Sequence, residues 1–262
     1  MDSKPLKAGI LRMEGTNNDS EAFRSFKEAG FDPEYIHIWE IEHHKVNLED
    51  YSALFIPGGF SAGDYVRAGA IFALRLKNAS GNSLKKIVDD GTPIIGACNG
   101  FQVLTETGMI GSSYGKRDVA LGVNQSGKFE CRTVYIKYTG KNKIFDGVID
   151  TGKIFEIPVA HKEGRIRFAD ENIMNKVLDS ERNLFSYANP YGDDMKYPWN
   201  PNGSMHSIAG ISGEYENIIG LMPHPERIYY DYQVSTYGRG RGMEPFGKLF
   251  FTAIKKYAER RN

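Results

Sequence analysis

A cysteine, a histidine and a glutamate lie in segments whose composition and spacing suit nucleophilic catalysis. Cys98 is bracketed by Gly96 and Gly100 in Gly-Ala-Cys-Asn-Gly, the cysteine form of a nucleophile elbow. In such an elbow a strand turns sharply into a helix, and side chains at the bracketing positions would collide with the backbone. The turn exposes the thiol beside a helix N-terminus, whose dipole favours the thiolate. The pattern therefore predicts Cys98 as a nucleophile.

A cysteine nucleophile needs a base and an acid that orients the base. The chain has six histidines, and His224 lies between two prolines at the end of a predicted strand, with Glu226 two residues on. Residues i and i+2 of an extended segment point to the same side, so the carboxylate can reach the imidazole. This spacing predicts His224 as the base and Glu226 as its orienting acid. Three other histidines are interpreted as structural or surface residues, and a fourth lies in a polar loop without a neighbouring acid: His37, His43 and His44, and His206.

Two backbone segments are candidates for an oxyanion hole. One is the amide of Asn99, next to the nucleophile at the start of the helix. The other is the turn Pro57-Gly58-Gly59, where missing side chains let the backbone approach a ligand. Taken alone, this turn is also what an ordinary strand end looks like. Glycines make a peptide flip cheap, so we also expect that the hole is incomplete until a partner binds.

A sheet must position these groups, and the first half of the chain alternates between predicted strands and predicted helices. The strands are Lys7–Met13, Tyr35–Ile41, Tyr51–Ile56 and the run Ile94–Ile95, and the helices are Ser20–Ala29, Ser83–Asp89 and a segment from the elbow to about Thr107. Asn17, Asn18 and Asp19 offer N-caps for the first helix. The alternation predicts an α/β fold with a doubly wound, mostly parallel sheet and an active site at the carboxyl ends of its strands.

The second half of the chain has a different pattern. Alternating segments from Val119 to about Ile157 predict a small antiparallel extension of the sheet, so residues 1–262 are expected to form a single domain. Asn189–Ser204 is rich in Asn, Pro, Gly and Tyr and is predicted to be a long loop. Ile218–Met222 is a predicted strand that His224 follows, and Pro245–Tyr257 is a predicted closing helix.

The composition excludes several classes of partner. Of 262 residues, 33 are basic and 33 acidic, so nothing favours binding to nucleic acid or to an anionic membrane. Two cysteines make no disulfide framework, which suits a reducing compartment, and Cys131 is interpreted as a small buried apolar residue in a strand. No run of ~18 apolar residues and no apolar signal core are present. We expect a soluble, cytoplasmic protein.

Three motifs in this order resemble the class I (triad) glutamine amidotransferases, which are flavodoxin-like: Pro57-Gly58-Gly59, Gly96–Gln102 and Pro223–Glu226. Further segments resemble the glutaminase subunits of phosphoribosylformylglycinamidine synthase: Phe60–Gly69, Pro158–Arg165, Asn200–Ser204 and Ile208–Ile211. The resemblance spans about Lys7 to Phe250. Ala62 stands where an aromatic residue is expected and Lys162 where glycine is, which affects the rim or partner contacts and not the triad.

The resemblance implies a reaction. Cys98 attacks the side-chain amide of L-glutamine, His224 moves the proton, and Glu226 orients His224. A glutamyl thioester forms, ammonia leaves, and water releases glutamate. By the family pattern Gln102 lines the glutamine pocket, with Gly58, Gly59 and Asn99 at the oxyanion. Three further residues are assigned to the rim of the site or to the partner interface: His161, Glu163 and Arg165.

The resemblance also implies partners. A synthase subunit that binds ATP and Mg²⁺ uses the ammonia to convert formylglycinamide ribonucleotide to formylglycinamidine ribonucleotide in purine biosynthesis, and a small third subunit completes the complex. This chain lacks a Gly-x-x-x-x-Gly-Lys-[Ser/Thr] loop and a recognisable paired acidic metal site, so we expect no cofactor and no metal in it.

Other readings of the triad remain open. A DJ-1/PfpI-like cysteine hydrolase resembles the predicted sheet, but that group typically has a histidine directly after the elbow cysteine, where Asn99 stands here. A glutaminase subunit of another amide-transferring synthase and a non-catalytic binding subunit are further alternatives. Hydrolysis of glutamine, assayed with and without a synthase partner, separates them.

Overall fold

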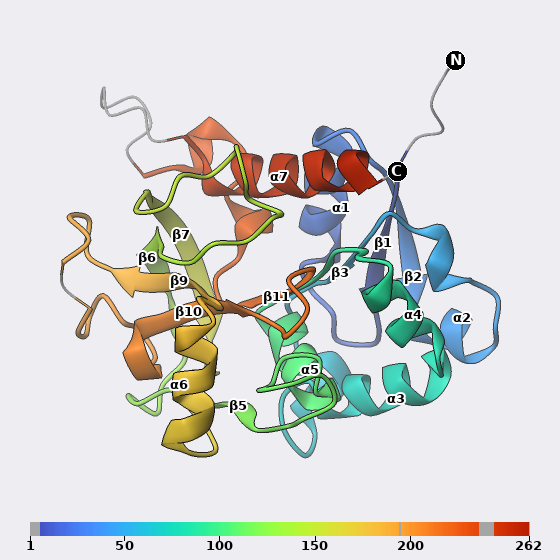
Figure 1. Cartoon of the computed structure of the whole chain (residues 1–262), viewed down its shortest axis with the longest axis horizontal. Helices are drawn as coiled ribbons and strands as arrows, with labels where there is room; N and C mark the ends of the chain where they lie inside the picture. The colour runs from blue at the N-terminus through green and yellow to red at the C-terminus, as the bar shows by residue number, and fades with distance from the viewer. Residues whose placement is uncertain (1–5, 194, 236–243, 262) are drawn as a thin grey trace.

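The computed structural model describes residues 6–193, 195–235 and 244–261 (Figure 1). Its strands are β1 (Lys7–Arg12), β2 (Asp32–His37), β3 (Ala53–Ile56), β4 (Ile94–Ala97), β5 (Val119–Val123), β6 (Glu130–Tyr138), β7 (Ile154–His161), β8 (Glu163–Phe168), β9 (Asn183–Ala188), β10 (Ile208–Ser212) and β11 (Ile218–Leu221). Its helices are α1 (Asp19–Glu28), α2 (Ile38–Glu42), α3 (Ala70–Ser80), α4 (Ser83–Asp89), α5 (Asn99–Thr107), α6 (Glu171–Asp179) and α7 (Phe246–Arg261).

Within the described residues, nine strands form one sheet in the order β2-β1-β3-β4-β11-β10-β9-β6-β7. The strands from β2 to β11 pair in parallel, and the pairs from β11 to β7 are antiparallel. β5 and β8 form a separate two-stranded sheet. The predicted α/β fold, with a mostly parallel sheet and an antiparallel extension, is confirmed. The elbow strand β4 and the strand β11 that precedes His224 are direct neighbours, which brings the two predicted halves of the triad to one edge.

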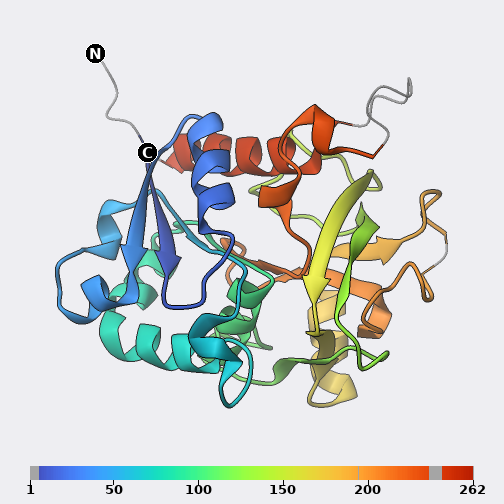
Figure 2. The same cartoon turned by 180° about the vertical axis from the view of Figure 1, so that it is seen from behind.

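The sheet buries an apolar cluster on each face. Ala53 and Phe55 of β3 belong to one cluster, and Leu54 and Ile56 to the other, as the alternation of a strand requires. Helices α1 and α7 lie side by side over the first face, whereas α3, α4 and α5 lie over the second (Figures 1 and 2). Cys98 lies in the second cluster, and Ile228, just after the predicted acid, lies in the first.

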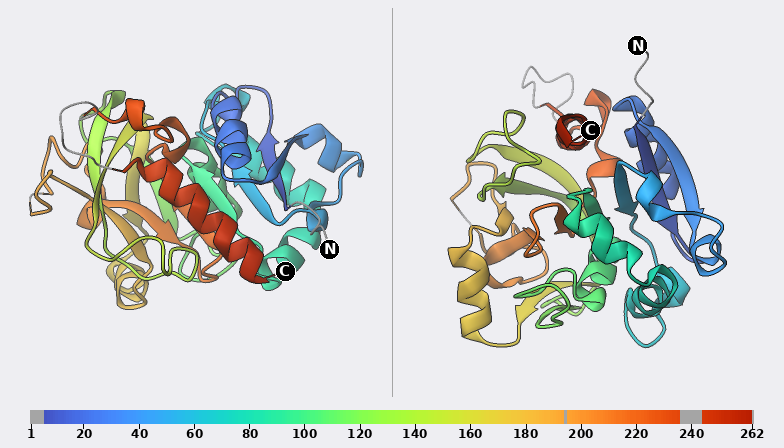
Figure 3. Two further views of the ribbon diagram at one scale, coloured as in Figure 1. Left: turned by 90° about the horizontal axis from the view of Figure 1, so that it is seen from above. Right: turned by 45° about the vertical axis from the view of Figure 1, so that its right-hand side comes forward.

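Helix α7 supports the segment that carries the predicted base and acid. It crosses the molecule beside α1, as the view from above shows (Figure 3). Its Gly247 N–H donates to the carbonyl oxygen of Ile228 at 3.1 Å, and a Cβ at Gly247 would lie 2.8 Å from the same oxygen. Phenylalanine side chains continue the contact: the ring of Phe251 packs edge-on against Phe26 of α1, with centroids 5.0 Å apart.

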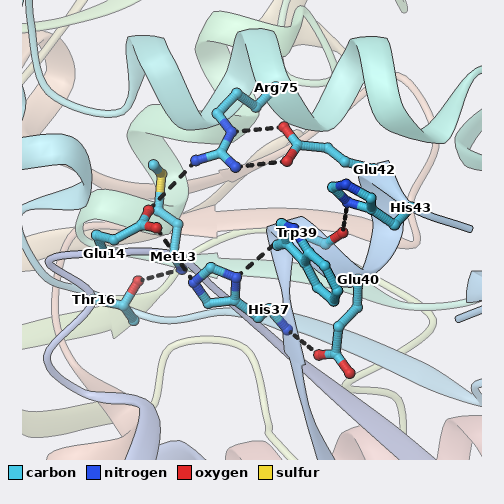
Figure 4. A network of polar contacts seen from close by, with 9 residues as sticks. All are labelled: Met13, Glu14, Thr16, His37, Trp39, Glu40, Glu42, His43 and Arg75. Atoms are coloured by element: carbon cyan, nitrogen blue, oxygen red, sulfur yellow. Dashed lines mark hydrogen bonds and ion pairs between the residues drawn. The ribbon is translucent and has the colours of Figure 1, made fainter. Parts of the chain in front are cut away.

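The predicted strand Tyr35–Ile41 is wrong in its second half. β2 ends at His37, and α2 begins at the next residue. The side chain of His37 accepts from the N–H of Trp39 at 3.2 Å, and Glu40 accepts from the N–H of His37 at 2.8 Å, which together form a capping box (Figure 4). Ile36 and Ile38 have the spacing of an alternating strand, whereas Ile38 and Ile41 have the spacing of a helical face. The spacing of these three residues therefore could not distinguish a strand from a helix.

An ion-pair network holds α2 against α3, a helix that the sequence analysis did not assign. Arg75 of α3 donates from Nε and Nη2 to the two carboxylate oxygens of Glu42, at 2.7 and 2.6 Å, and from Nη1 to Glu14 at 3.4 Å (Figure 4). Because both oxygens of Glu42 accept from the guanidinium of Arg75, the pair fixes the orientation of the guanidinium and also attracts its charge. Buried Phe72 and Leu76, four residues apart, are the signal that predicts this helix.

The other predicted elements are largely confirmed. Helix α5 ends at Thr107 with Gly108 in the left-handed conformation (φ 78°), and α4 spans Ser83–Asp89 as predicted. Residues 189–204 contain no helix or strand in their described part, which leaves out residue 194. A search of the described residues finds no helix long and apolar enough to cross a membrane.

Candidate active site

Cys98 lies at the tip of a strained turn between β4 and α5. Its φ of 50° and ψ of −107° are unusual for a residue with a side chain and cost about 1–3 kcal/mol. The glycines on either side make the turn possible. A Cβ at Gly96 would overlap the carbonyl group of Gly100, and a Cβ at Gly100 would overlap the carbonyl oxygen of Ile56 on β3. The structure thus has the geometry of the predicted elbow.

His224 and Glu226 form a buried pair directly after β11. Nδ1–H of His224 donates to Oε1 of Glu226 at 2.6 Å, and the two side chains are 1% and 0% exposed. The main chain of His224 is extended (φ −105°, ψ 92°), and its N–H donates to the carbonyl oxygen of Pro158 at 3.0 Å. Burial lowers the pKa of His224, but the charges of Glu226 and the Cys98 thiolate outweigh it and raise the pKa to about 10. The ring is therefore an imidazolium at neutral pH.

The thiol and the imidazole meet at Gly58. A Cβ there would lie 2.6 Å from Cε1 of His224 and 3.3 Å from Cβ of Cys98, so the two side chains border one point and any larger residue would separate them. In the thiol form, Sγ donates to the carbonyl oxygen of Ala160 on β7 at 3.5 Å. Nε2 of His224 is buried without a hydrogen-bond partner among the described residues. Nε2 is therefore the nitrogen of His224 that is available to give or accept a proton during a reaction.

The peptide between Gly58 and Gly59 has one well-defined orientation. The carbonyl oxygen of Gly58 accepts from the N–H groups of Asn17 and Asn18, both at 3.1 Å. In a trans peptide the next N–H points the opposite way. Across the described part of the chain, neither the Gly59 N–H nor the Asn99 N–H has an acceptor. These two donors are the candidate oxyanion hole.

Two hydrogen bonds to the Gly58 carbonyl oxygen oppose a flip of this peptide. A flip would break both hydrogen bonds to Gly58, each with a net contribution of about 0.5–1.5 kcal/mol. Gly59 itself has a φ of 154°, and a Cβ there would lie 2.6 Å from the nitrogen of Asn17. Glycine is thus required at position 59 because the loop before α1 packs against it, and not because the turn is loose.

The side chain of Asn99 links the start of α5 to the segment that follows Gly59 and to Gln102. Its Oδ1 accepts from the N–H of Ser61 at 3.3 Å, and its Nδ2 donates to Oε1 of Gln102 at 2.8 Å and to Asp64 at 3.4 Å. Gln102 in turn donates to the carbonyl oxygen of Glu163 at 2.5 Å. Burial and the nearby charge of Glu163 raise the pKa of Asp64 to about 6. Gln102 and Glu163 therefore lie together beside the start of α5, where the sequence analysis placed the glutamine pocket and its rim.

His161 and Arg165 have different surroundings. His161 is buried at the end of β7, with Nδ1 3.1 Å from Oδ1 of Asn124. Burial and the charge of His224 lower the pKa of His161 to about 3, so it stays neutral beside the imidazolium. Arg165 donates from Nε to the carbonyl oxygen of Gly203 at 2.9 Å, which ties β8 to the long loop. Of the three rim residues, the structure brings His161 and Glu163 to the site and turns Arg165 toward the loop.

Sequence reasoning missed one neighbour of the base. Asn18 was predicted as a helix cap, and it does occupy the N-cap position of α1, but its side chain makes no capping hydrogen bond. Its side-chain Nδ2 lies 3.0 Å from Nδ1 of His224. No signal in the sequence points to this contact, because it depends on how the loop after β1 lies against the loop after β11.

The interpretation of Cys131 as a buried residue is wrong. Cys131 lies in β6, as expected, but its side chain is exposed, whereas that of Cys98 is buried. β6 lies between β7 and β9 in the sheet, and the side chain of Cys131 points away from the core. Accessibility alone would therefore make Cys131 the faster cysteine to react.

We expect a reagent that resembles glutamine to react faster with Cys98 than with Cys131. A chloroketone analogue of glutamine should label Cys98 first, because only Cys98 has an imidazolium beside it and a hole for the carbonyl oxygen, whereas iodoacetamide should label the exposed Cys131 readily. Peptide mapping after brief exposure measures both sites, with excess glutamine as the protection control. Equal labelling of the two cysteines by the analogue would end the assignment of Cys98.

In the described residues, no group of three or more His, Cys, Asp or Glu side chains is arranged to hold a metal ion. The arrangement of Cys98, His224 and Glu226 can perform covalent catalysis on a carbonyl group, with a nucleophile, a proton carrier and an acid, and with the N–H groups of Gly59 and Asn99 as candidate oxyanion donors.

Known proteins resemble this chain over nearly its whole length. A model of the CobB/CobQ-like glutamine amidotransferase domain matches residues 5–258. The phosphoribosylformylglycinamidine synthase subunit PurQ of Picrophilus torridus is 49% identical over 255 residues, which cover 97% of this chain and 98% of that protein. The subunit of the same name from Archaeoglobus fulgidus is 38% identical over 275 residues, covering 99% and 100%. A chain from the structure of PurLQS of Thermotoga maritima superimposes with a TM-score of 0.74 at 31% identity, covering 97% of this chain and 99% of that one.

Proposed function

Since the chain belongs to the CobB/CobQ-like glutamine amidotransferases and, among them, to the PurQ subunits, we propose that it hydrolyses L-glutamine through Cys98, His224 and Glu226. It is the glutaminase subunit of phosphoribosylformylglycinamidine synthase, an enzyme of purine biosynthesis. The observation that supports the site assignment best is the convergence of the elbow thiol and the buried imidazolium at Gly58. Beside them lie the N–H groups of Gly59 and Asn99, which have no acceptor among the described residues.

The geometry suggests the order of events. The Cys98 thiolate attacks the amide carbon of glutamine, and the carbonyl oxygen becomes an oxyanion that the N–H groups of Gly59 and Asn99 stabilise. His224 then gives its Nε2 proton to the amide nitrogen, the C–N bond breaks, and ammonia leaves a glutamyl thioester on Cys98. Glu226 keeps its charge throughout and holds the ring, since Nδ1–H remains bonded to it.

The second half-reaction reverses the proton movements. Neutral His224 accepts a proton from water at Nε2 while the hydroxide adds to the thioester carbonyl, and the same two N–H groups stabilise the second oxyanion. Collapse breaks the C–S bond, releases glutamate and restores the thiolate beside the imidazolium. Atoms and charge balance as glutamine plus water giving glutamate, ammonia and one proton, which the new carboxylic acid loses to solvent.

We further propose that the ammonia is delivered to a synthase subunit that binds ATP, Mg²⁺ and formylglycinamide ribonucleotide, with a small third subunit in the complex. The similar Thermotoga maritima chain comes from a structure named PurLQS, which supports a synthase partner. Exposed apolar residues follow the Gly58-Gly59 turn: Tyr65 and Val66 are 76% and 89% exposed, and Phe60 stacks on Phe129, with ring centroids 6.4 Å apart. Such a patch beside a site that releases ammonia suits a protein interface.

The orientation of the Gly58–Gly59 peptide predicts how strongly a partner can activate the site. Loss of one oxyanion donor costs ~10²–10³-fold in rate, and the hydrogen bonds to the Gly58 carbonyl oxygen hold the peptide in the orientation that leaves the Gly59 N–H without an acceptor among the described residues. We therefore expect the isolated chain to hydrolyse glutamine, and a synthase partner with its nucleotide and substrate to raise kcat by less than about 10²-fold.

Steady-state glutamate release, measured for the chain alone and in the complex, tests the proposal and the prediction together. A stimulation of 10²–10³-fold or more would show that the hole is unformed without the partner. Absence of glutamine hydrolysis in both samples would refute the proposed function itself.

A further inference from the structure

Asn18 contacts the ring of His224 although 206 positions separate them in the chain. A residue at an N-cap position ordinarily uses its side-chain oxygen to accept from the N–H groups of the first helical turn. The side chain of Asn18 makes no such bond, and its Nδ2 lies 3.0 Å from Nδ1 of His224. The start of α1 therefore lacks this stabilising hydrogen bond, and the side chain of Asn18 contacts the imidazole of His224 instead.

The proton on Nδ1 determines which atom of the Asn18 amide faces the ring. Nδ1 lies 2.6 Å from Oε1 of Glu226, and the carboxylate can only accept, so Nδ1 carries a proton. A second donor facing this proton would be repelled, whereas an oxygen attracts it. The oxygen and nitrogen of an asparagine amide exchange places by a half-turn of the terminal torsion. We therefore assign Oδ1, by a half-turn that exchanges it with Nδ2, to the position 3.0 Å from Nδ1, where it shares the Nδ1 proton with Oε1 of Glu226.

The main chain of the same residue holds the other half of the site. The N–H of Asn18 donates to the carbonyl oxygen of Gly58 at 3.1 Å, which keeps the N–H of Gly59 turned away from the loop. The side chain also lies against Gly58, because a Cβ there would be 2.8 Å from the amide atom of Asn18 that faces the ring and 2.6 Å from Cε1 of His224. Asn18 thus contacts both the oxyanion-hole peptide and the base.

We propose that Asn18 is a positioning residue that fixes the base and the oxyanion hole relative to each other. Its N–H sets the orientation of the Gly58–Gly59 peptide, and its side-chain oxygen sets the rotation of the His224 ring together with Glu226. The inference rests on the proposed function, because only a reaction that uses both groups at one carbon requires them in fixed register. Misplacement of reacting groups by about 1 Å can cost 10²-fold in rate.

The contact also affects the charge of the ring. The titratable groups around His224 are Glu226 on its own segment, Cys98 at the elbow and His161 on β7. An acceptor at Nδ1 stabilises the imidazolium more than the neutral ring. Removing the acceptor must therefore lower the pKa of His224. The loss of activity on the alkaline side should then occur at a lower pH.

The test compares Asn18→Leu, which removes the acceptor at similar size, with Asn18→Asp, which keeps it. Asn175→Leu, at an exposed position of α6, is the matched control. For Asn18→Leu we expect kcat to fall by ~10–10²-fold with KM for glutamine nearly unchanged, and the alkaline limb to move down by about one pH unit. Asn18→Asp should restore most of kcat without lowering the limb, and the control should match the wild type.

Two results would overturn the inference. One is an Asn18→Leu variant with wild-type kcat and pH profile, which would mean that Glu226 alone holds the ring. The other is an equal loss in both Asn18 variants with an unmoved alkaline limb, which would indicate simple misfolding around α1. Titration of the His224 ring nitrogens by ¹⁵N NMR supplies a readout that needs no turnover, so a lowered pKa in Asn18→Leu is detectable even if the wild type does not hydrolyse glutamine.

Discussion

A Cys98→Ala variant, assembled with its synthase partner, is expected to lose glutamine-dependent synthesis and to keep ammonia-dependent synthesis. Without Sγ no thioester can form, and His224 and Glu226 have no nucleophile to serve. We expect glutamine hydrolysis to fall by roughly 10⁴–10⁶-fold, the range in which loss of a triad nucleophile lies. Alanine keeps the Cβ of the original residue, so the elbow (φ 50°) should hold its shape.

The two nitrogen sources make this variant its own control. Product formation is measured with saturating glutamine and, separately, with ammonium salt at high pH, where free ammonia is abundant. Retained activity with ammonia shows that the complex has assembled and that only the supply of ammonia is broken. Loss of both activities would point to failed assembly, and retention of both would exclude Cys98 as the nucleophile.

Glu226→Gln keeps the size of the side chain but removes the charge that stabilises His224. We expect glutaminase turnover to drop by roughly 10²–10⁴-fold, because the ring loses its charged partner and is free to take the wrong tautomer. In the wild type the charge of Glu226 helps to raise the pKa of His224 to about 10, and the variant loses that contribution. The remaining activity should therefore decline at a lower pH on the alkaline side.

The measurement is a pH profile of kcat for glutamine hydrolysis in the wild type and in Glu226→Gln. Glu163→Gln serves as a comparison, since it changes the same residue type beside Asp64, and Glu163 is not among the groups that shift the pKa of His224. A Glu226→Gln enzyme within a few-fold of the wild type would mean that another group orients the base. The carboxylate would then have only a structural role in this buried turn.

Local patterns predicted the parts of the site that are close in sequence. The elbow could be found because Gly96 and Gly100 are required by contacts within one turn and with the adjacent strand. The pair His224 and Glu226 could be found because an extended backbone alone brings i and i+2 together. The alternation of elements predicted a mostly parallel sheet but not the order of its strands, in which β4 and β11 lie side by side.

Features that depend on packing between distant segments could not be predicted. The contact of Asn18 with His224 and the two bonds to the Gly58 carbonyl join three separate loops, and no spacing encodes them. The exposure of Cys131 depends on which face of β6 meets the core. The end of β2 at His37 depends on a capping box that competes with an equally plausible strand pattern.

Because the two apolar clusters lie on opposite faces of the sheet, catalysis depends on the folding of both faces. The nucleophile is anchored in the cluster under α3, α4 and α5, whereas the turn that carries the base is anchored under α1 and α7. If either face of the sheet loosened, most of the secondary structure would survive, but the thiol and the imidazole would lose their register. Turnover of this protein is therefore a measure of cooperativity across the whole sheet, and a partly folded chain would be inert rather than wasteful of glutamine.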